Sequence, residues 1–228
     1  MENPPRGRPK EFPHDWDSNL QTWKAMTSFK QGHLDGMCGI YALMNAIYFL
    51  GKHESIMVDF TQEKLMELMK KAAENGNDVG RFFTKGMCIN DFTILFNVEK
   101  NGIIDLVNEE ITQGYTGITS GWGTQKKSNS EDFFKLMQTK LRRHDDDTRP
   151  HLAVALLIRE KDHWITIVAE GEDRYGRSYL AALDSRISTN RGRRMIRLEH
   201  IDETFSCGQD GQLLTLRVDH LHKTKFVA

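Results

Sequence analysis

The chain has 228 residues, of which 39% are hydrophobic and 28% are charged. This size and balance favour one globular domain with its own core. The formal net charge of -1 at pH 7 excludes a whole-molecule electrostatic attraction to nucleic acid or to an anionic membrane surface. Nucleic acid and membranes are therefore not expected partners, and any anion-binding site must be local.

No stretch of the chain approaches the roughly 18 uninterrupted apolar residues of a membrane-spanning helix. Residues 1–12, MENPPRGRPKEF, lack the apolar region of a secretion signal. We therefore expect a cytoplasmic protein, although export by a signal-independent route would leave no mark on the sequence.

The three cysteines, Cys38, Cys88 and Cys207, lie far apart and include no Cys-x-x-Cys pair. An odd number with this spacing does not indicate a disulfide framework, and no set of cysteines and histidines has the spacing of zinc ligands. We expect a reducing compartment, no metal and no cofactor.

The N-terminal end differs in composition from the rest of the chain. Four of the five prolines precede residue 14, and a proline-rich polar segment favours disorder or an extended strap. We expect residues 1–14 to form a tail and residues 15–228 to form a single domain.

The first helices in chain order follow from apolar periodicity and capping residues. Residues 38–50 carry apolar side chains at helical spacing on most sides, which predicts a central helix that ends at Gly51. Thr61 is a candidate N-cap for a second helix, which reaches the pair Asn75-Gly76.

Two further helices are predicted for residues 90–100 and for residues 130–142, the latter with acids first and bases last. Between them, residues 114–129, GYTGITSGWGTQKKSN, are polar and rich in glycine. We expect this segment to be a surface loop that borders a cleft.

After Pro150 the pattern changes to short apolar and β-branched runs. HLAVALLI, HWITIVA, YLAALD, RMIRL and LLTLRV are typical of strands, and turn-like sequences separate several of them. Helices followed by strands indicate an α+β domain whose C-terminal half is a mostly antiparallel sheet.

A candidate nucleophile stands at the start of the central helix, in the sequence QGHLDGMCGIYALMN. A thiol attacks a carbonyl carbon as the thiolate, and a helix N-terminus or a nearby imidazolium lowers the thiol pKa. Cys38 would have both, while Gly36 and Gly39 would let the backbone approach a substrate. Helix N–H groups and the Gln31 amide would stabilise an oxyanion, by roughly 3 to 4 kcal/mol for one such donor. The alternative is a cysteine that is simply a small buried apolar residue.

The best candidate base among the nine histidines is His163, which begins the strand HWITIVA. Asp184 ends the next strand, YLAALD, and antiparallel pairing would place the two residues at the same end of a hairpin. Asp184 would then orient the imidazole ring. Cys88 also begins a predicted helix, but the sequence offers no matching base or oxyanion donor for it.

The ordered set Gln31, Cys38 at a helix start, His163 and Asp184 resembles the papain-like cysteine peptidase superfamily, and most closely its bacteriocin-processing peptidase-like branch. The similarity covers about residues 29–186. It implies a papain-like fold with the nucleophile at the start of a central helix. It also implies Cys38 as nucleophile, His163 as general base and acid, Asp184 as orienting residue, and Gln31 as oxyanion donor.

Met37 stands directly before the cysteine, where that branch usually has an acid. The sequence DGMCGIYAL is similar instead to the Asp-Gly-x-Cys signature of ovarian-tumour-type deubiquitinases, in which an acid near the cysteine can orient the histidine. Asp35 is therefore an alternative to Asp184. Adenovirus-type peptidases have His and Asp before Cys, which is not the chain order here.

A cysteine-dependent hydrolase, either a protease or an isopeptidase, is the expected function, and its substrate would be a protein or peptide. Glutamine deamidation, transglutaminase-like crosslinking and acyl transfer use the same triad and stay open. The expected substrate contacts are Asp35, Gly36, Gly39, Trp122 and Trp164. The arginine-rich segment 186–197 would suit a substrate with an acidic surface. In a non-catalytic domain, the same segment would dock a partner.

Overall fold

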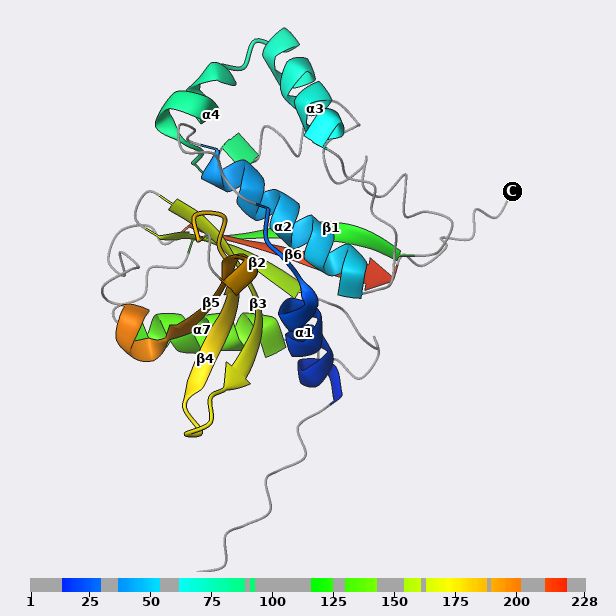
Figure 1. Cartoon of the computed structure of the whole chain (residues 1–228). Coiled ribbons are helices and arrows are strands. Elements are labelled where there is room, and N and C mark those ends of the chain that lie inside the picture. Colours follow the sequence, from blue (N-terminus) through cyan, green and yellow to red (C-terminus); the bar gives the residue numbers. More distant parts are fainter. Residues whose placement is uncertain are drawn as a thin grey trace, which may run out of the picture.

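A computed structural model describes residues 14–29, 37–53, 62–88, 91–92, 116–124, 130–142, 154–160, 163–187, 190–201 and 212–220. Within them, helices pack on an antiparallel sheet, so the predicted α+β class is confirmed (Figure 1). None of the helices in the described ranges has the length and apolar character needed to cross a membrane.

The α-helices are α1 (His14–Ala25), α2 (Cys38–His53), α3 (Gln62–Glu74), α4 (Gly80–Lys85) and α7 (Ser130–Arg142). The strands are β1 (Thr116–Thr124), β2 (Val154–Glu160), β3 (His163–Glu172), β4 (Ser178–Leu183), β5 (Arg193–Arg197) and β6 (Gln212–His220). Two short 3-10 turns flank β5, namely η1 (Asn190–Gly192) and η2 (Leu198–His200).

The described strands form one sheet in the order β1-β6-β2-β3-β4-β5, and each pairing is antiparallel. The strands β2, β3, β4 and β5 are neighbours in sequence as well as in space. The consecutive pairs therefore form hairpins, and the β3–β4 hairpin carries the predicted histidine and aspartate near one of its ends. The strand β6 enters between β1 and β2 from the C-terminal part of the chain.

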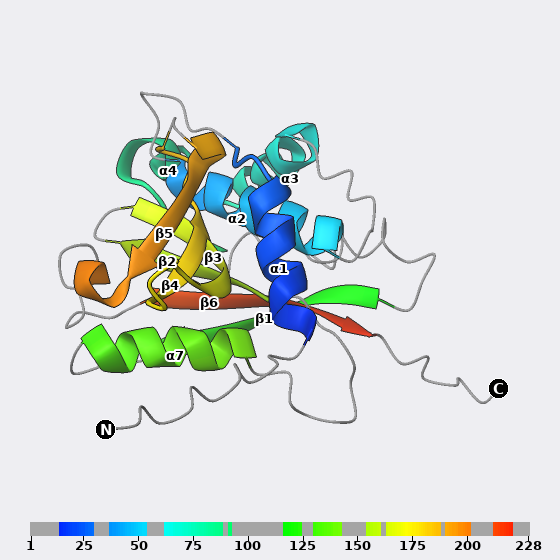
Figure 2. The same cartoon turned by 60° about the horizontal axis from the view of Figure 1, so that its bottom comes forward.

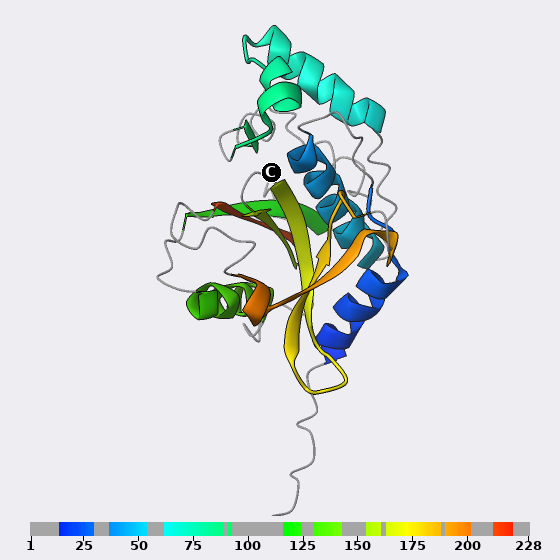
Figure 3. The ribbon, with the colours of Figure 1, turned by 60° about the vertical axis from the view of Figure 1, so that its left-hand side comes forward.

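Helices cover both faces of the sheet: α1 and α2 lie on one face and α7 lies on the other, while α3 and α4 lie beside α2 (Figures 2 and 3). Because successive side chains of a strand point to opposite faces, each strand can supply two separate cores. On β2, Leu157 packs with the α1 and α2 cluster, whereas Leu156 and Ile158 pack with the α7 cluster.

The helix α2 is the central element predicted from its apolar pattern. Five of its large apolar side chains are at most 1% exposed, namely Ile40, Leu43, Ile47, Phe49 and Leu50. Burying one side chain of this kind contributes about 1.5 to 3 kcal/mol. The helix is also tied to the sheet by a polar contact, since the Thr166 hydroxyl of β3 donates to the Ala42 carbonyl oxygen at 2.6 Å.

Two structural predictions were wrong. The segment expected to be a surface loop, residues 114–129, contains β1, which pairs along its length with β6. The backbone hydrogen bonds that β6 offers outweigh the low strand propensity of the glycines in β1. Gly51 does not end the central helix, which continues to His53.

The N-terminal boundary and one helix are tested only in part. Residues 1–13 of the predicted tail lie outside the described residues, but residue 14 already begins α1. Of the helix predicted for residues 90–100, residues 91 and 92 are described and are helical. The other residues of that prediction also lie outside the described ranges.

Candidate active site

Cys38 is the first residue of α2 and is 3% exposed. The first turn closes when the Tyr41 N–H donates to the Met37 carbonyl oxygen at 3.1 Å. The preceding N–H groups at a helix start have no acceptor within the helix, and the helix dipole makes this end positive. The fold therefore offers the Cys38 thiol an environment that favours its anionic form.

Gly39 has a packing role. A Cβ atom built on it would lie 2.9 Å from both Cβ and Sδ of Met87, closer than atoms pack. The missing side chain lets the segment before residue 88 lie directly against the start of α2. The space that a side chain at Gly39 would take is thus occupied by Met87, and the expectation that the Gly39 backbone lies near a substrate stays a prediction.

His163 is the first residue of β3 and is 2% exposed. The next residue, Trp164, fixes this end of the strand because its indole N–H donates to the Met87 carbonyl oxygen at 2.7 Å. The Trp164 ring also meets Phe92 edge to face, with centroids 4.8 Å apart. At 1% exposure the Trp164 side chain belongs to the core, and its expected role as a substrate contact stays a prediction.

Asp184 directly follows β4 and is 3% exposed. Its Oδ1 lies 2.8 Å from His163 Nε2 and also accepts the Arg186 backbone N–H at 2.9 Å. Its Oδ2 accepts a hydrogen bond from Arg194 Nη1 at 3.3 Å. The carboxylate is therefore held on both oxygens, which fixes the direction from which it meets the imidazole.

The backbone around Asp184 is held by a turn before β5. Gly192 has φ +72°, and a Cβ atom there would lie 1.7 Å from Ser28 Oγ and 2.9 Å from the Asp184 carbonyl oxygen. Only glycine fits this place without displacement. The Gly192 carbonyl accepts the Asp184 N–H at 2.8 Å, and the Ser28 hydroxyl donates to the Asp184 carbonyl at 3.2 Å. The segment after α1 thus fixes the end of β4.

The imidazole of His163 connects the carboxylate to the thiol. Because Nε2 faces Asp184, Nδ1 is the ring nitrogen left to exchange a proton with Cys38. Nδ1 is buried and makes no hydrogen bond of good geometry within the described residues. Cys38 is nevertheless close enough to interact with the ring and to change its pKa. The sulfur, the imidazole and the carboxylate therefore form one buried cluster.

The pKa values of this cluster shift in the directions that favour an ion pair. Burial raises the pKa of Cys38, but its side-chain interaction with His163, the Trp164 backbone and the charges of His163 and Arg186 outweigh burial and lower it. Burial lowers the pKa of His163, but its interactions with Asp184 and Cys38 outweigh burial and raise it. These opposite shifts favour thiolate and imidazolium.

The pKa of Asp184 is lowered, so the carboxyl group stays ionised beside the ring. Burial alone raises this pKa, but the hydrogen bond with His163, the charge of His163, the Arg186 N–H and the charge of Arg194 together lower it. The sequence did not indicate that Arg194 takes part. The strand register explains its place, because Arg194 pairs across the β4–β5 hairpin with Ala182, two positions before Asp184.

Of the four remaining predicted site residues, only Trp122 lies in the described part of the chain. Gln31, Asp35 and Gly36 lie outside the described residues, so neither the oxyanion donor nor the alternative orienting acid is placed. Trp122 lies on β1, where its backbone partner is Leu214.

Of the other two cysteines, only Cys88 lies in the described part of the chain. Cys88 is a free, partly exposed cysteine whose backbone N–H donates to Asp91 Oδ2 at 2.6 Å. Cys207 lies outside the described residues.

Several arginines of the arginine-rich segment make contacts within this chain. Arg194 binds Asp184, Arg197 binds Asp173, and Arg193 donates to the Lys24 carbonyl oxygen. Arg186 and Arg191 are exposed. Part of the predicted anion-binding edge therefore stabilises this chain.

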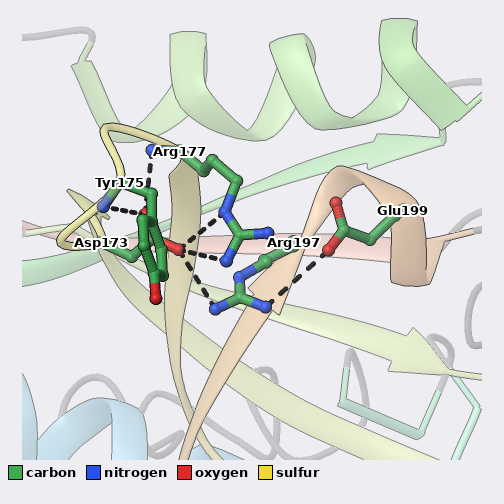
Figure 4. A network of polar contacts seen from close by, with 5 residues as sticks. All are labelled: Asp173, Tyr175, Arg177, Arg197 and Glu199. Carbon is green, nitrogen blue, oxygen red and sulfur yellow. Dashed lines mark hydrogen bonds and ion pairs between the residues drawn. The ribbon is translucent and has the colours of Figure 1, made fainter.

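A second polar network lies at the opposite end of the β3–β4 hairpin (Figure 4). Asp173 accepts the backbone N–H groups of Tyr175 and Arg177 at 2.9 and 3.1 Å. It also forms ion pairs with the guanidinium groups of Arg177 at 2.8 Å and Arg197 at 3.2 Å. These contacts hold the turn and attach it to β5.

The described part of the chain contains no group of three or more His, Cys, Asp or Glu residues arranged to hold a metal ion. The chain matches no protein-family model. A search of curated proteins likewise finds no significant match.

Proposed function

We propose that the protein is a papain-like cysteine-dependent hydrolase that cleaves an amide bond in a protein or peptide. One observation carries the proposal: Cys38, His163 and Asp184 come from three separate elements and meet in one buried cluster. A helix with a thiol at its N-terminus, packed on an antiparallel sheet that supplies the base and the acid, supports the papain-like assignment.

The first half of the reaction forms a thioester. The Cys38 thiolate bonds to the carbonyl carbon, and the carbonyl π electrons move to the oxygen. N–H groups at the start of α2 stabilise that negative charge. The oxyanion then collapses, the C–N bond breaks, and His163 Nδ1 gives its proton to the leaving amine.

The second half regenerates the thiolate. His163 Nδ1 accepts a proton from water while the water oxygen bonds to the thioester carbon. When this intermediate collapses, the C–S bond breaks, a carboxylic acid leaves, and the sulfur departs as thiolate beside the imidazolium. Asp184 stays ionised throughout, holding the ring by Nε2 and stabilising its positive charge.

The experiment compares two cysteines of the same chain. Cys38 is 3% exposed, whereas Cys88 is partly exposed. Accessibility alone therefore predicts that Cys88 reacts faster with iodoacetamide. An activated thiolate predicts the reverse order at pH 6, because ordinary thiols are then almost fully protonated. Peptide mapping by mass spectrometry after short exposure measures the two rate constants.

Two variants give controls. Cys88→Ala should leave the Cys38 rate unchanged, whereas His163→Gln should lower the Cys38 rate at pH 6 by about 10-fold or more, since one unit of pKa corresponds to a factor of ten. If Cys38 in the folded wild-type protein reacts no faster than Cys88, the proposal is overturned. If His163→Gln leaves the Cys38 rate unchanged, the imidazole does not activate the thiol and the proposed mechanism fails.

The class of amide substrate is tested with substrate-like electrophiles that label a reactive cysteine covalently. Short peptidyl fluoromethyl ketones and ubiquitin with a C-terminal electrophile should differ in their rate of Cys38 labelling. Preference for the peptidyl probe supports a peptidase, and preference for the ubiquitin probe supports an isopeptidase. Labelling of Cys38 by neither probe would contradict hydrolysis of both substrate classes.

A further inference from the structure

Met87 follows α4 and contacts the residues that directly follow Cys38 and His163. A Cβ atom on Gly39 would lie 2.9 Å from both Cβ and Sδ of Met87, so Met87 packs against the start of α2. The Met87 carbonyl oxygen accepts the indole N–H of Trp164 at 2.7 Å, which attaches it to the start of β3. Met87 therefore connects the two elements that supply the thiol and the imidazole.

The peptide group between Met87 and Cys88 is held on both sides. Its oxygen accepts the Trp164 indole N–H, and its N–H donates to Asp91 Oδ2 at 2.6 Å. Asp91, this peptide group and Trp164 thus form one chain of hydrogen bonds. A carboxylate at one end polarises the peptide group and strengthens its bond at the other end. Met87 lies outside the helices and strands, so these contacts replace the regular hydrogen bonds of such an element.

Asp91 is fully buried and has no part in the proposed chemistry. Its Oδ1 binds the Arg81 guanidinium of α4, and its N–H donates to the Cys88 carbonyl oxygen at 3.1 Å. Burying a carboxylate costs free energy unless it is paired and hydrogen-bonded, and both conditions hold here. The neighbour of Arg81 on α4, Phe82, is 1% exposed and anchors this helix in the core. The chain of hydrogen bonds is therefore attached to a fixed element.

We propose that Asp91 and Trp164 are positioning residues, whose side chains hold the start of α2 and the start of β3 together for catalysis. They act through the peptide group that follows Met87. This inference rests on the proposed function, because positioning matters only if Cys38 and His163 react together. The attraction between thiolate and imidazolium falls with their separation. Loosening the chain of hydrogen bonds should therefore weaken the effect of His163 on Cys38 and raise the pKa of the thiol.

Trp164→Phe tests the chain of hydrogen bonds without removing any charge. Phenylalanine keeps an aromatic ring beside Phe92 but has no N–H for the Met87 carbonyl oxygen. Iodoacetamide rate constants at Cys38, measured over a range of pH, give the pH midpoint of thiolate formation. We expect this midpoint to rise by about 0.5 to 1 unit, which slows alkylation on the acid side of the midpoint by about 3- to 10-fold.

Trp23→Phe is the matched control. Trp23 is also a buried tryptophan whose indole N–H donates to a backbone carbonyl oxygen, that of Ala182, at 2.9 Å. Ala182 lies within β4 and pairs with Ile167 of β3 and Arg194 of β5, so the sheet holds it without this bond. The two variants lose the same donor group, and urea unfolding compares their stabilities. Trp23→Phe should leave the pH midpoint of Cys38 unchanged.

Asp91→Asn tests the other end of the chain, and the sign of its effect is informative. Loss of a negative charge by itself favours a thiolate and would lower the pH midpoint of Cys38. Loss of positioning raises the midpoint instead, and we expect a rise. Asp173→Asn is the matched control, because Asp173 also accepts backbone N–H groups and binds a guanidinium group. It should leave the midpoint unchanged.

The outcomes separate this inference from the proposed function. A wild-type midpoint in Trp164→Phe, or an equal rise in Trp164→Phe and Trp23→Phe, overturns the inference, even if Asp91→Asn is too unstable to assay. An unchanged or lower midpoint in folded Asp91→Asn overturns the role of Asp91. In these cases the proposed function stands as long as wild-type Cys38 outpaces Cys88 with iodoacetamide. If Cys38 does not outpace Cys88, the proposed function itself fails.

Discussion

Two carboxylates at opposite ends of the β3–β4 hairpin are held by the same local device. Asp184 accepts the N–H of Arg186, and Asp173 accepts the N–H of Tyr175, each from two residues further along the chain and each at 2.9 Å. Each carboxylate also meets an arginine of β5: Arg194 contacts Asp184 at 3.3 Å, and Arg197 contacts Asp173 at 3.2 Å.

The two ends differ in the third partner. Asp184 binds His163, a group whose proton can move, and His163 in turn interacts with Cys38. Asp173 binds Arg177, a group that keeps its charge at any accessible pH. A lowered carboxyl pKa is common to both ends and therefore does not mark a reactive site by itself. What distinguishes the Asp184 end is a titratable ring between the acid and a thiol.

The largest expected effect is a difference in stability between alanine variants of two glycines, one near each end of the hairpin. Gly192 and Gly176 have nearly equal φ angles, +72° and +73°, but a Cβ atom at Gly192 would clash with Ser28 and one at Gly176 would meet nothing within 4 Å. We expect Gly176→Ala to lower the free energy of unfolding by roughly 1 to 2 kcal/mol, the cost of the left-handed conformation. Gly192→Ala should lower it by about 3 kcal/mol or more.

Urea unfolding of both glycine variants, followed by circular dichroism, measures this difference. Because the clash reaches the Asp184 carbonyl oxygen, Gly192→Ala should also slow iodoacetamide labelling of Cys38, and Gly176→Ala should not. Equal losses of stability in the two variants would show that the close contact among Gly192, Ser28 and Asp184 does not constrain the folded protein.

The next effect concerns the two acids themselves. Asp184→Asn removes the charge that raises the pKa of His163. A smaller fraction of His163 is then imidazolium, and the pKa of Cys38 should rise. We expect the iodoacetamide rate at Cys38 and pH 6 to fall by about 10-fold, which corresponds to one unit of thiol pKa. Asp173→Asn should leave that rate within about 2-fold of wild type. A wild-type rate for Asp184→Asn would remove Asp184 from the site and favour Asp35 instead.

A smaller effect is expected from the two arginines of β5. The folded pKa of Asp184 is lowered, so its ionised form predominates above that pKa and is lost as the pH falls through it. Without the charge of Arg194 this pKa rises, so in Arg194→Gln the loss occurs at higher pH. The acid side of the pH profile for Cys38 alkylation should shift upward.

Arg197→Gln is the matched control, because Arg197 contacts Asp173 at the other end of the hairpin. Its pH profile for Cys38 alkylation should coincide with that of the wild-type protein. Coincident profiles for Arg194→Gln and the wild-type protein would show that Arg194 has no electrostatic influence on the triad.

The smallest effect is a titration that should leave the candidate site unaffected. Burial raises the pKa of Asp173, but hydrogen bonds from the Arg177 side chain, the Arg177 N–H and the Tyr175 N–H, with the charge of Arg177, lower it to about 2. Any stability that this pKa shift contributes is present above the ordinary pKa of 3.8 and is lost as the pH falls through about 2. Carbon-13 NMR of the Asp173 carboxyl group should give this midpoint. A midpoint near 3.8 would contradict the network in Figure 4.

Local sequence patterns determined the elements that carry the candidate site. Apolar periodicity placed Cys38 at the start of α2, and alternating strand patterns placed His163 at the start of β3 and Asp184 directly after β4. The β3–β4 connection is short, so antiparallel pairing of these strands follows from neighbouring sequence. The contact between His163 and Asp184 was therefore predictable, and the structure confirms it at 2.8 Å.

Only the tertiary structure decided the contacts that depend on distant segments. The glycine-rich segment before α7 became β1 because β6, far along the chain, supplies its hydrogen bonds. Gly39 and Trp164 became packing residues because Met87 folds against both. No local period encodes which remote segment fills a given space, since that choice depends on closing long loops and on the shape of the whole core.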